Sequence, residues 1–224
     1  NGSITPNKQS QVPTKGLIAY YAFDGNCLDS SGNSNNATTT GNIQFAKGRN
    51  GESKGAIRFS YASINSVTLP HSEAFQRKTF TINAWVRTDT DYGGGIIVSK
   101  GYPTWGGSFY LAVNLCAVRY DEDNYIGAYM YEDETQLPPA NKWQMITGVI
   151  NDGWSGIYLN GKLMYGGNTG ASMKYFNRLP LSIGSYSYDG ILDADRMIFD
   201  GDIDDVRIYN VVLSDEEIQQ LYKE

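Results

Sequence analysis

Residues 199–222, FDGDIDDVRIYNVVLSDEEIQQLY, contain the signals from which the fold of this chain can be worked out. The stretch opens with four aspartates and continues into an apolar alternation over residues 206–209, which predicts a strand. Ser214 followed three residues later by Glu217 is the pattern of a capping box, so we expect a helix to begin there. Three apolar residues then recur at helical spacing and predict a buried helix face: Ile218, Leu221 and Tyr222.

Asp204 lies at the entry to this predicted strand. Since side chains alternate in direction along a strand, we expect Asp204 to share a face with Val206 and Ile208. A carboxylate at the rim of a core needs a cation or a set of donors, because burying it unpaired is costly. The alternative is a solvated aspartate with backbone hydrogen bonds alone, and the stretch itself leaves both interpretations open.

The composition favours an all-β protein and argues against several classes of partner. The chain has 224 residues, 41% of them hydrophobic, with 25 glycines and 17 tyrosines, which suits many strands and turns. The net charge of -6, without a basic cluster, argues against nucleic acid and anionic membrane surfaces. No apolar run approaches the ~20 residues of a transmembrane segment. Cys27 and Cys116 can form one disulfide, but no local feature requires it.

Apolar alternation predicts strands along the chain after a polar linker or tail over residues 1–15. Asn160-Gly161 between two such segments is the strongest short-range hairpin signal. The expected strands, one of them a hairpin at 157–165, cover residues 17–23, 57–59, 67–69, 80–86, 96–99, 108–115, 125–131, 142–150, 157–165, 181–184 and 206–209. Strands throughout, turn-rich connections and one C-terminal helix predict a two-sheet antiparallel sandwich.

Eight segments, taken in their order and spacing, resemble the concanavalin A-like jelly-roll superfamily, and specifically the laminin G-like module of secreted bacterial proteins. The segments are GLIAYYAFDGN (16–26), DSSGNSNNAT (29–38), FTINAWVRTD (80–89), IIVSKG (96–101), KWQMITGVI (142–150), IYLNGKL (157–163), PLSIG (180–184) and GDIDDVRIYNVVLSDEEIQQLY (201–222). The resemblance implies one jelly-roll domain over residues 16–224 with neighbouring first and last strands. It also implies an extracellular, cell-surface or periplasmic protein whose signal or lipoprotein segment has been removed.

The resemblance further implies a structural calcium ion where an Asp-Gly-Asn turn meets the Asp-Asp strand entry, pinning the chain ends together. Calcium takes roughly six to eight oxygen ligands from carboxylates, amides and backbone carbonyls. The side chains expected to bind it are Asp24, Asn26, Asn33 and Asp204, with Asp29 and Asn36 as reserves. The alternative is that these residues only form turns, which Asp-Gly-Asn and Ser-Gly-Asn do without a metal.

Aromatic side chains in loop-like segments are the second functional signal. Sugars present apolar C–H faces that stack on Trp or Tyr rings, while polar neighbours bond the hydroxyls. Trp85 and Trp143 fall in predicted strands, so we assign them to sheet packing. The rings expected to bind a ligand are Trp105, Trp154, Tyr102, Tyr186 and Tyr188, with Tyr92 as a further ring and Asp152, Asn168, Asp189 and Arg196 as polar neighbours. The alternative for each ring is that it covers an edge of the sandwich.

The chain lacks the Glu-x-Asp-x-Glu strand that supplies the catalytic acids of the superfamily's glucanases. Residues 121–123 and 132–134 hold acids at alternate positions without the third one, and His71 supports no Ser-His-acid arrangement. We therefore predict a non-catalytic carbohydrate-binding or cell-surface recognition module, lectin-like, with a glycan or polysaccharide as partner. The alternatives are a glycoside hydrolase or polysaccharide lyase with an unrecognised carboxylate site, and a structural or adhesion module that binds protein.

Overall fold

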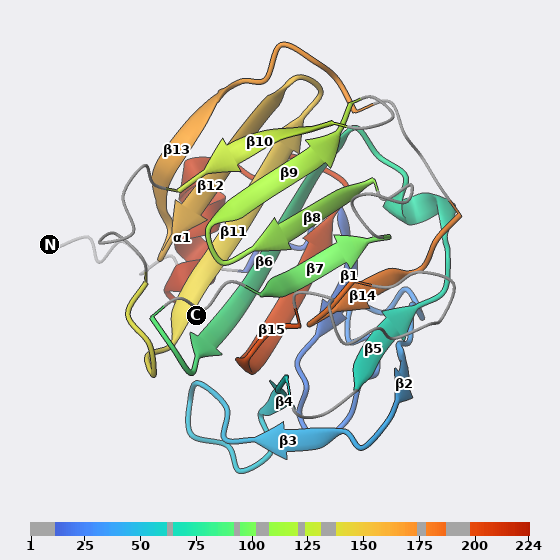
Figure 1. The fold of residues 1–224 in the computed structure, drawn as a ribbon, viewed down its shortest axis with the longest axis vertical. Helices are drawn as coiled ribbons and strands as arrows, with labels where there is room; N and C mark the ends of the chain where they lie inside the picture. The colour runs from blue at the N-terminus through green and yellow to red at the C-terminus, as the bar shows by residue number, and fades with distance from the viewer. Residues whose placement is uncertain are drawn as a thin grey trace, which may run out of the picture.

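The computed structural model describes residues 12–61, 65–91, 95–101, 108–120, 124–130, 138–173, 178–186 and 198–224. They form two antiparallel sheets that pack face to face, with a short helix at the C-terminal end (Figure 1). The predicted two-sheet sandwich is therefore confirmed. No helix among the described residues is long and apolar enough to cross a membrane.

Sheet A has eight strands in the order β13-β12-β11-β6-β15-β4-β3, with β1 paired to β15 beside this path. Their bounds are β1 (Leu17–Tyr21), β3 (Gln44–Ala46), β4 (Ala56–Phe59), β6 (Thr79–Thr88), β11 (Gln144–Asn151), β12 (Trp154–Leu159), β13 (Lys162–Asn168) and β15 (Gly201–Tyr209). The pairing of β1 with β15 is antiparallel, so the first and last strands are neighbours, as the resemblance implied. Asn160 and Gly161 both have positive φ and turn β12 back onto β13, which confirms the predicted hairpin.

Sheet B has seven strands in the order β10-β9-β8-β7-β14-β5-β2. Their bounds are β2 (Thr38–Thr40), β5 (Ser66–Leu69), β7 (Ile96–Lys100), β8 (Phe109–Ala112), β9 (Leu115–Arg119), β10 (Tyr125–Tyr129) and β14 (Leu181–Ile183), and a 3₁₀ helix, η1 (Glu73–Phe75), lies between β5 and β6. The single strand predicted over residues 108–115 is wrong, because the chain turns after Ala112 and β9 pairs back on β8. Apolar alternation reports burial, and it continued through this turn.

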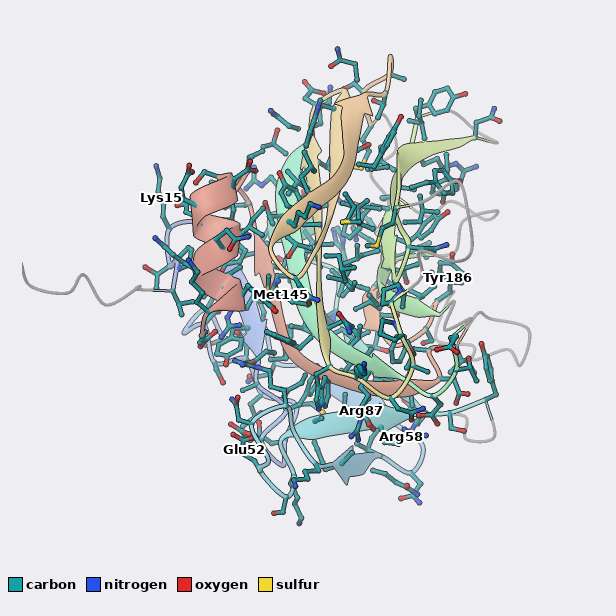
Figure 2. All side chains as sticks on the ribbon, turned by 90° about the vertical axis from the view of Figure 1, so that its left-hand side faces the viewer. Lys15, Glu52, Arg58, Arg87, Met145 and Tyr186 are labelled. Atoms are coloured by element: carbon teal, nitrogen blue, oxygen red, sulfur yellow. The ribbon has the colours of Figure 1, made fainter. Side chains whose placement is uncertain are left out.

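The main core lies between the sheets, and helix α1 (Asp215–Tyr222) covers part of the outer face of sheet A, the face turned away from sheet B (Figure 2). Ile218 and Leu221 of α1 pack on Trp85 of this face. Burying an Ile or Leu side chain contributes about 1.5–3 kcal/mol, which docks the helix. The capping box at Ser214 is present in both directions, as predicted. Both cysteines, Cys27 and Cys116, are buried and free.

The described end of the predicted tail, residues 12–15, lies against the domain. Val12 packs on the outer face of sheet A, beside the cluster that holds α1. The Tyr209 hydroxyl donates a hydrogen bond of 3.0 Å to the Pro13 carbonyl. Packing therefore begins a few residues before Gly16.

Candidate functional site

A β-bulge in β15 determines where Asp204 points. Asp204 lies opposite Trp85 and Arg207 opposite Asn83, with a register shift between them. Asp205, at φ 47, is the extra residue. The prediction that Asp204 shares a face with Val206 and Ile208 is therefore wrong, because the bulge interrupts the alternation of side chains. Asp204 lies on the outer face of sheet A, with Trp85.

Arg49 supplies the positive charge beside the bulge. Its backbone N–H donates to Asp204 Oδ2 at 3.0 Å, and its Nε donates to Asp205 Oδ2 at 2.7 Å. The Tyr20 hydroxyl donates to the other oxygen of Asp205 at 2.5 Å. Burial, and then the charge of Asp205, raise the pKa of Asp204 to about 7, while the contacts with Arg49 act in the opposite direction. The cation that this strand entry requires is thus an arginine of the chain.

A second arginine ties the end of α1 to the same cluster. Arg207 Nη2 lies 2.9 and 2.8 Å from the two carboxylate oxygens of Glu224. Its guanidinium lies over the Tyr20 ring at 4.1 Å from the centroid, and that of Arg49 lies over Trp85 at 4.9 Å. Buried charges are tolerated when they are paired and hydrogen-bonded. The cluster therefore fastens the loop at Arg49 and the helix end to β15.

The other predicted calcium ligands make local hydrogen bonds. The Asn26 amide donates to the Asp24 carbonyl at 3.1 Å and its oxygen accepts from the Leu28 N–H at 2.9 Å, which is a turn closed by a side chain. The Asn33 amide nitrogen donates to the Leu17 carbonyl at 3.0 Å. The Asn26 turn is one that the alternative interpretation expected, whereas the Asn33 bond joins its loop to β1.

The residues present fit a calcium ion poorly. The reserve ligand Asp29 already accepts hydrogen bonds from Tyr20, Ser31 and Asn35. Asp204 contacts Arg49, whose positive charge opposes a second cation. Within the described residues no group of three or more His, Cys, Asp or Glu side chains could hold a metal. The calcium ion of the resemblance stays a prediction.

The predicted ligand-binding aromatics fall into three groups. Trp154 packs on the outer face of sheet A, with the cluster under α1. Tyr186 packs on the outer face of sheet B, where it is 3% exposed and meets Tyr110 edge-on at 5.9 Å. The two rings therefore belong to opposite faces of the sandwich. The remaining candidates lie outside the described residues: Trp105, Tyr102, Tyr188, Tyr92, Asp189 and Arg196.

The outer face of sheet B carries a cluster of tyrosines around two small residues. Tyr125, Gly127 and Tyr129 alternate on this side of β10, and Gly127 lies opposite Ala117. Ala117 lies in turn opposite Tyr110 on β8. The Tyr110 and Tyr125 rings are 5.4 Å apart, both half-buried, and Tyr129 is 57% exposed. We call Tyr110, Tyr125 and Tyr129 the tyrosine face.

A row of hydroxyl side chains continues from the tyrosine face across sheet B. Tyr110 lies opposite Ser99, and Ser99 opposite Ser182. Ser182 lies opposite Thr68, which lies opposite Thr38 on the edge strand β2. Directly opposite residues share a face. Residues far apart in the sequence thus form one hydroxyl row that is buried at its serine end and exposed at Thr38.

Within the described part of the chain, several hydroxyls near the tyrosine face and the hydroxyl row are buried without a hydrogen-bond partner: Ser108, Tyr125, Ser182 and Ser185. Leaving such a group unpaired costs about 1–3 kcal/mol. Burial raises the pKa of Tyr110 to about 12 and also raises that of Tyr125, so both phenols stay protonated and can donate at neutral pH. The face therefore combines apolar rings with hydroxyls that lack protein partners.

The catalytic candidates of the sequence give no paired site in the described part of the chain. The acidic segments 121–123 and 132–134 lie outside it. The His71 ring nitrogens lie 3.4 Å from Lys100 Nζ and 3.4 Å from Glu73 Oε1. Gln76 Nε2 lies 3.3 Å from His71 Nε2 as well, so the described partners of His71 are a lysine, a glutamate and a glutamine, with no serine among them.

The sandwich and its short helix define a jelly-roll domain. A family model described as the concanavalin A-like lectin/glucanases superfamily, of laminin G type, matches residues 62–219, and the chain belongs to this superfamily. The resemblance stated from the sequence is confirmed. A comparison with curated proteins gave no match.

Among solved structures, domain 4 of AbnA, a GH43 extracellular arabinanase from Geobacillus stearothermophilus in complex with arabinotriose, is similar at TM-score 0.65 and 19% identity, covering 92% of this chain and 98% of that domain. The binding domain of Paraclostridial Mosquitocidal Protein 1 is similar at TM-score 0.72 and 18% identity, covering 95% and 52%. The receptor binding domain of botulinum neurotoxin mosaic serotype C/D is similar at TM-score 0.69 and 17% identity, covering 95% of this chain and 51% of that domain. The chain spans about half of these two toxin domains, and the likeness shows a shared fold.

Proposed function

We propose that this chain is a non-catalytic carbohydrate-binding module whose glycan lies on the outer face of sheet B. The observation that carries the proposal is the tyrosine face, whose rings surround Ala117 and Gly127 and adjoin the hydroxyl row. A sugar presents apolar C–H surface for ring stacking and hydroxyls for hydrogen bonding, which is the chemistry of this face. The similar arabinanase domain was solved with arabinotriose, which supports a saccharide ligand.

The exposure of the tyrosine side chains indicates where a glycan first contacts the protein. Tyr129, half-buried Tyr125 and half-buried Tyr110 present ring surface to solvent. The serine hydroxyls at Ser182 and Ser185 are buried, so a ligand reaches them only by displacing the atoms above them. We therefore infer that a glycan stacks first on the tyrosine face and extends along the hydroxyl row toward Thr38.

The test is a glycan array run with and without calcium, beside a polysaccharide hydrolysis screen. We expect binding without turnover, reduced about fivefold by Tyr129→Ala, since one ring–sugar stack is worth about 1 kcal/mol. Tyr61→Ala is the matched control, because Tyr61 is 59% exposed against 57% for Tyr129 and lies outside the tyrosine face. Turnover would favour the hydrolase or lyase alternative. Silence on the array together with capture of a protein ligand would favour an adhesion module.

Two further parts of the proposal follow from the resemblance. The module is expected outside the cell, on its surface or in the periplasm, which cell fractionation tests. The resemblance also implies a calcium ion at Asp24, Asn26, Asn33 and Asp204, whereas the contacts of these residues fit one poorly, and calorimetric titration of chelated protein decides between the two. The ion would be rejected if addition of calcium produced no heat and no shift of the melting temperature.

A further inference from the structure

We propose a second glycan-contact site, centred on Trp154 on the outer face of sheet A. It rests on the proposed function, since it assumes that the ligand of this chain is a glycan. Trp154 is the first residue of β12 and is half-buried beside the cluster that docks α1. The site would make the module bivalent, because Trp154 and the tyrosine face lie on opposite sheets.

Two glycines allow the Trp154 ring to lie down on the sheet. A Cβ built at Gly156 or at Gly166 would come closer than 3.0 Å to the six-membered part of the indole. Gly156 and Gly166 lie opposite each other on β12 and β13, so the ring covers the backbone of both strands. A larger side chain at either position would lift the ring. With one face against the glycines, we infer that the half-buried ring offers its other face for stacking.

Polar groups flank the ring on both sides. Asn151 on β11 and Asn168 on β13 are the register partners of Trp154, and both are exposed. In the described part of the chain, neither amide forms a side-chain hydrogen bond, and the Trp154 indole N–H has no partner and is absent from the buried unpaired atoms. A carboxamide both donates and accepts, so it can pair with either role of a sugar hydroxyl.

The charge around the ring selects a neutral sugar. Asp152, two residues before Trp154, lies 3.8 Å from Lys78, and the two charges compensate each other. This pair offers an acidic glycan no unpaired cation and a cationic ligand no unpaired carboxylate. An uncharged saccharide that stacks on the ring and pairs with the two amides uses every group of the site.

The two sites cannot serve one short glycan segment. Figure 2 shows Tyr186, which packs on the outer face of sheet B, on the opposite side of the molecule from α1 and Met145, whose cluster includes Trp154 at its border. A monomer would therefore bridge two polysaccharide chains. If Trp154 only shields the backbone of β12 and β13, its removal would lower stability without changing cross-linking.

The experiment compares retardation of the protein in native gels with turbidity, using soluble arabinan, xylan and laminarin as probes. We expect the wild type to be retarded and to cloud at least one probe. Trp154→Ala and Asn168→Ala should still be retarded, with binding weakened by at most about tenfold, but their mixtures with polysaccharide should no longer become turbid. Asn168→Ala keeps the ring, so it remains informative if Trp154→Ala fails to fold. Trp143→Ala, which removes a tryptophan that lies under Arg87, is the control and should keep both the retardation and the turbidity.

The outcomes distinguish failure of the Trp154 site from failure of the proposed function. Unchanged turbidity in both variants, with retardation lost only in Tyr125→Ala, would overturn the Trp154 site and leave the proposed function intact. If no probe retards or clouds the wild type, while the glycan array is also silent, the proposed function fails and this site with it.

Discussion

Replacing Asp204 by asparagine should stabilise the protein at high pH. Asp204 is 4% exposed, and its pKa is about 7 in the folded chain against an ordinary value of 3.8. A carboxyl whose folded pKa is raised favours its protonated form in the native state. The native state is therefore penalised as the pH rises from about 4 to about 7, and the full cost remains above that window. Asparagine keeps an acceptor for the Arg49 N–H without the charge.

The magnitude follows from the shift of about three pKa units. At about 1.4 kcal/mol per unit, the upper bound of the gain is about 4 kcal/mol at pH 8, falling to near zero at pH 4. Urea unfolding of wild type and Asp204→Asn at half-unit pH steps measures it. Asp24→Asn, at an exposed turn, is the control and should change stability by less than about 0.5 kcal/mol.

The opposite result would refute this reasoning. If Asp204→Asn is less stable than wild type at pH 8, the carboxylate is charged and satisfied in the native state. If both Asp204→Asn and Asp24→Asn lose stability only when calcium is present, the two residues bind the ion that the resemblance implies.

The remaining predictions concern stability and the role of Arg49. Arg49→Ala should cost about 3 kcal/mol, because it leaves the buried Asp205 carboxylate with fewer donors, and millimolar calcium should not restore the melting temperature; a full rescue by calcium would contradict the assignment of the cation to Arg49. Gly184→Ala should cost more than about 3 kcal/mol in urea unfolding, because φ is 81 and a Cβ would clash with a core phenylalanine ring. Gly32→Ala, at φ 87 in open space, should cost only about 1 kcal/mol, and equal losses would refute the clash.

Much of the fold could be predicted from local patterns. The capping box at Ser214 and the Asn160-Gly161 turn are complete within a few residues, so neither depends on distant partners. The bulge at Asp205 was missed because the alternation rule assumes a regular strand. The pair Asp204-Asp205 is a usable signal for a bulge, because aspartate adopts positive φ more readily than most residues do.

The candidate site was less accessible from sequence, because it depends on strand order. Thr38, Thr68, Ser99 and Ser182 are single hydroxyl residues in separate strands, and only the order β7-β14-β5-β2 brings them into one row. Arg49 lies in a loop with no periodic pattern, so nothing in the chain pointed to its contacts with β15. Trp154 was selected from its sequence context, but its glycine support comes from two different strands.

The most direct test of the central claim is amide chemical-shift mapping during titration with arabinotriose and with the glycan that binds most strongly on the array. If a glycan stacks on the tyrosine face, the amides of Ala117 and Gly127, which lie between Tyr110, Tyr125 and Tyr129, should shift in a saturable way. Saturable binding with no shift at either amide would contradict the placement of the glycan on sheet B.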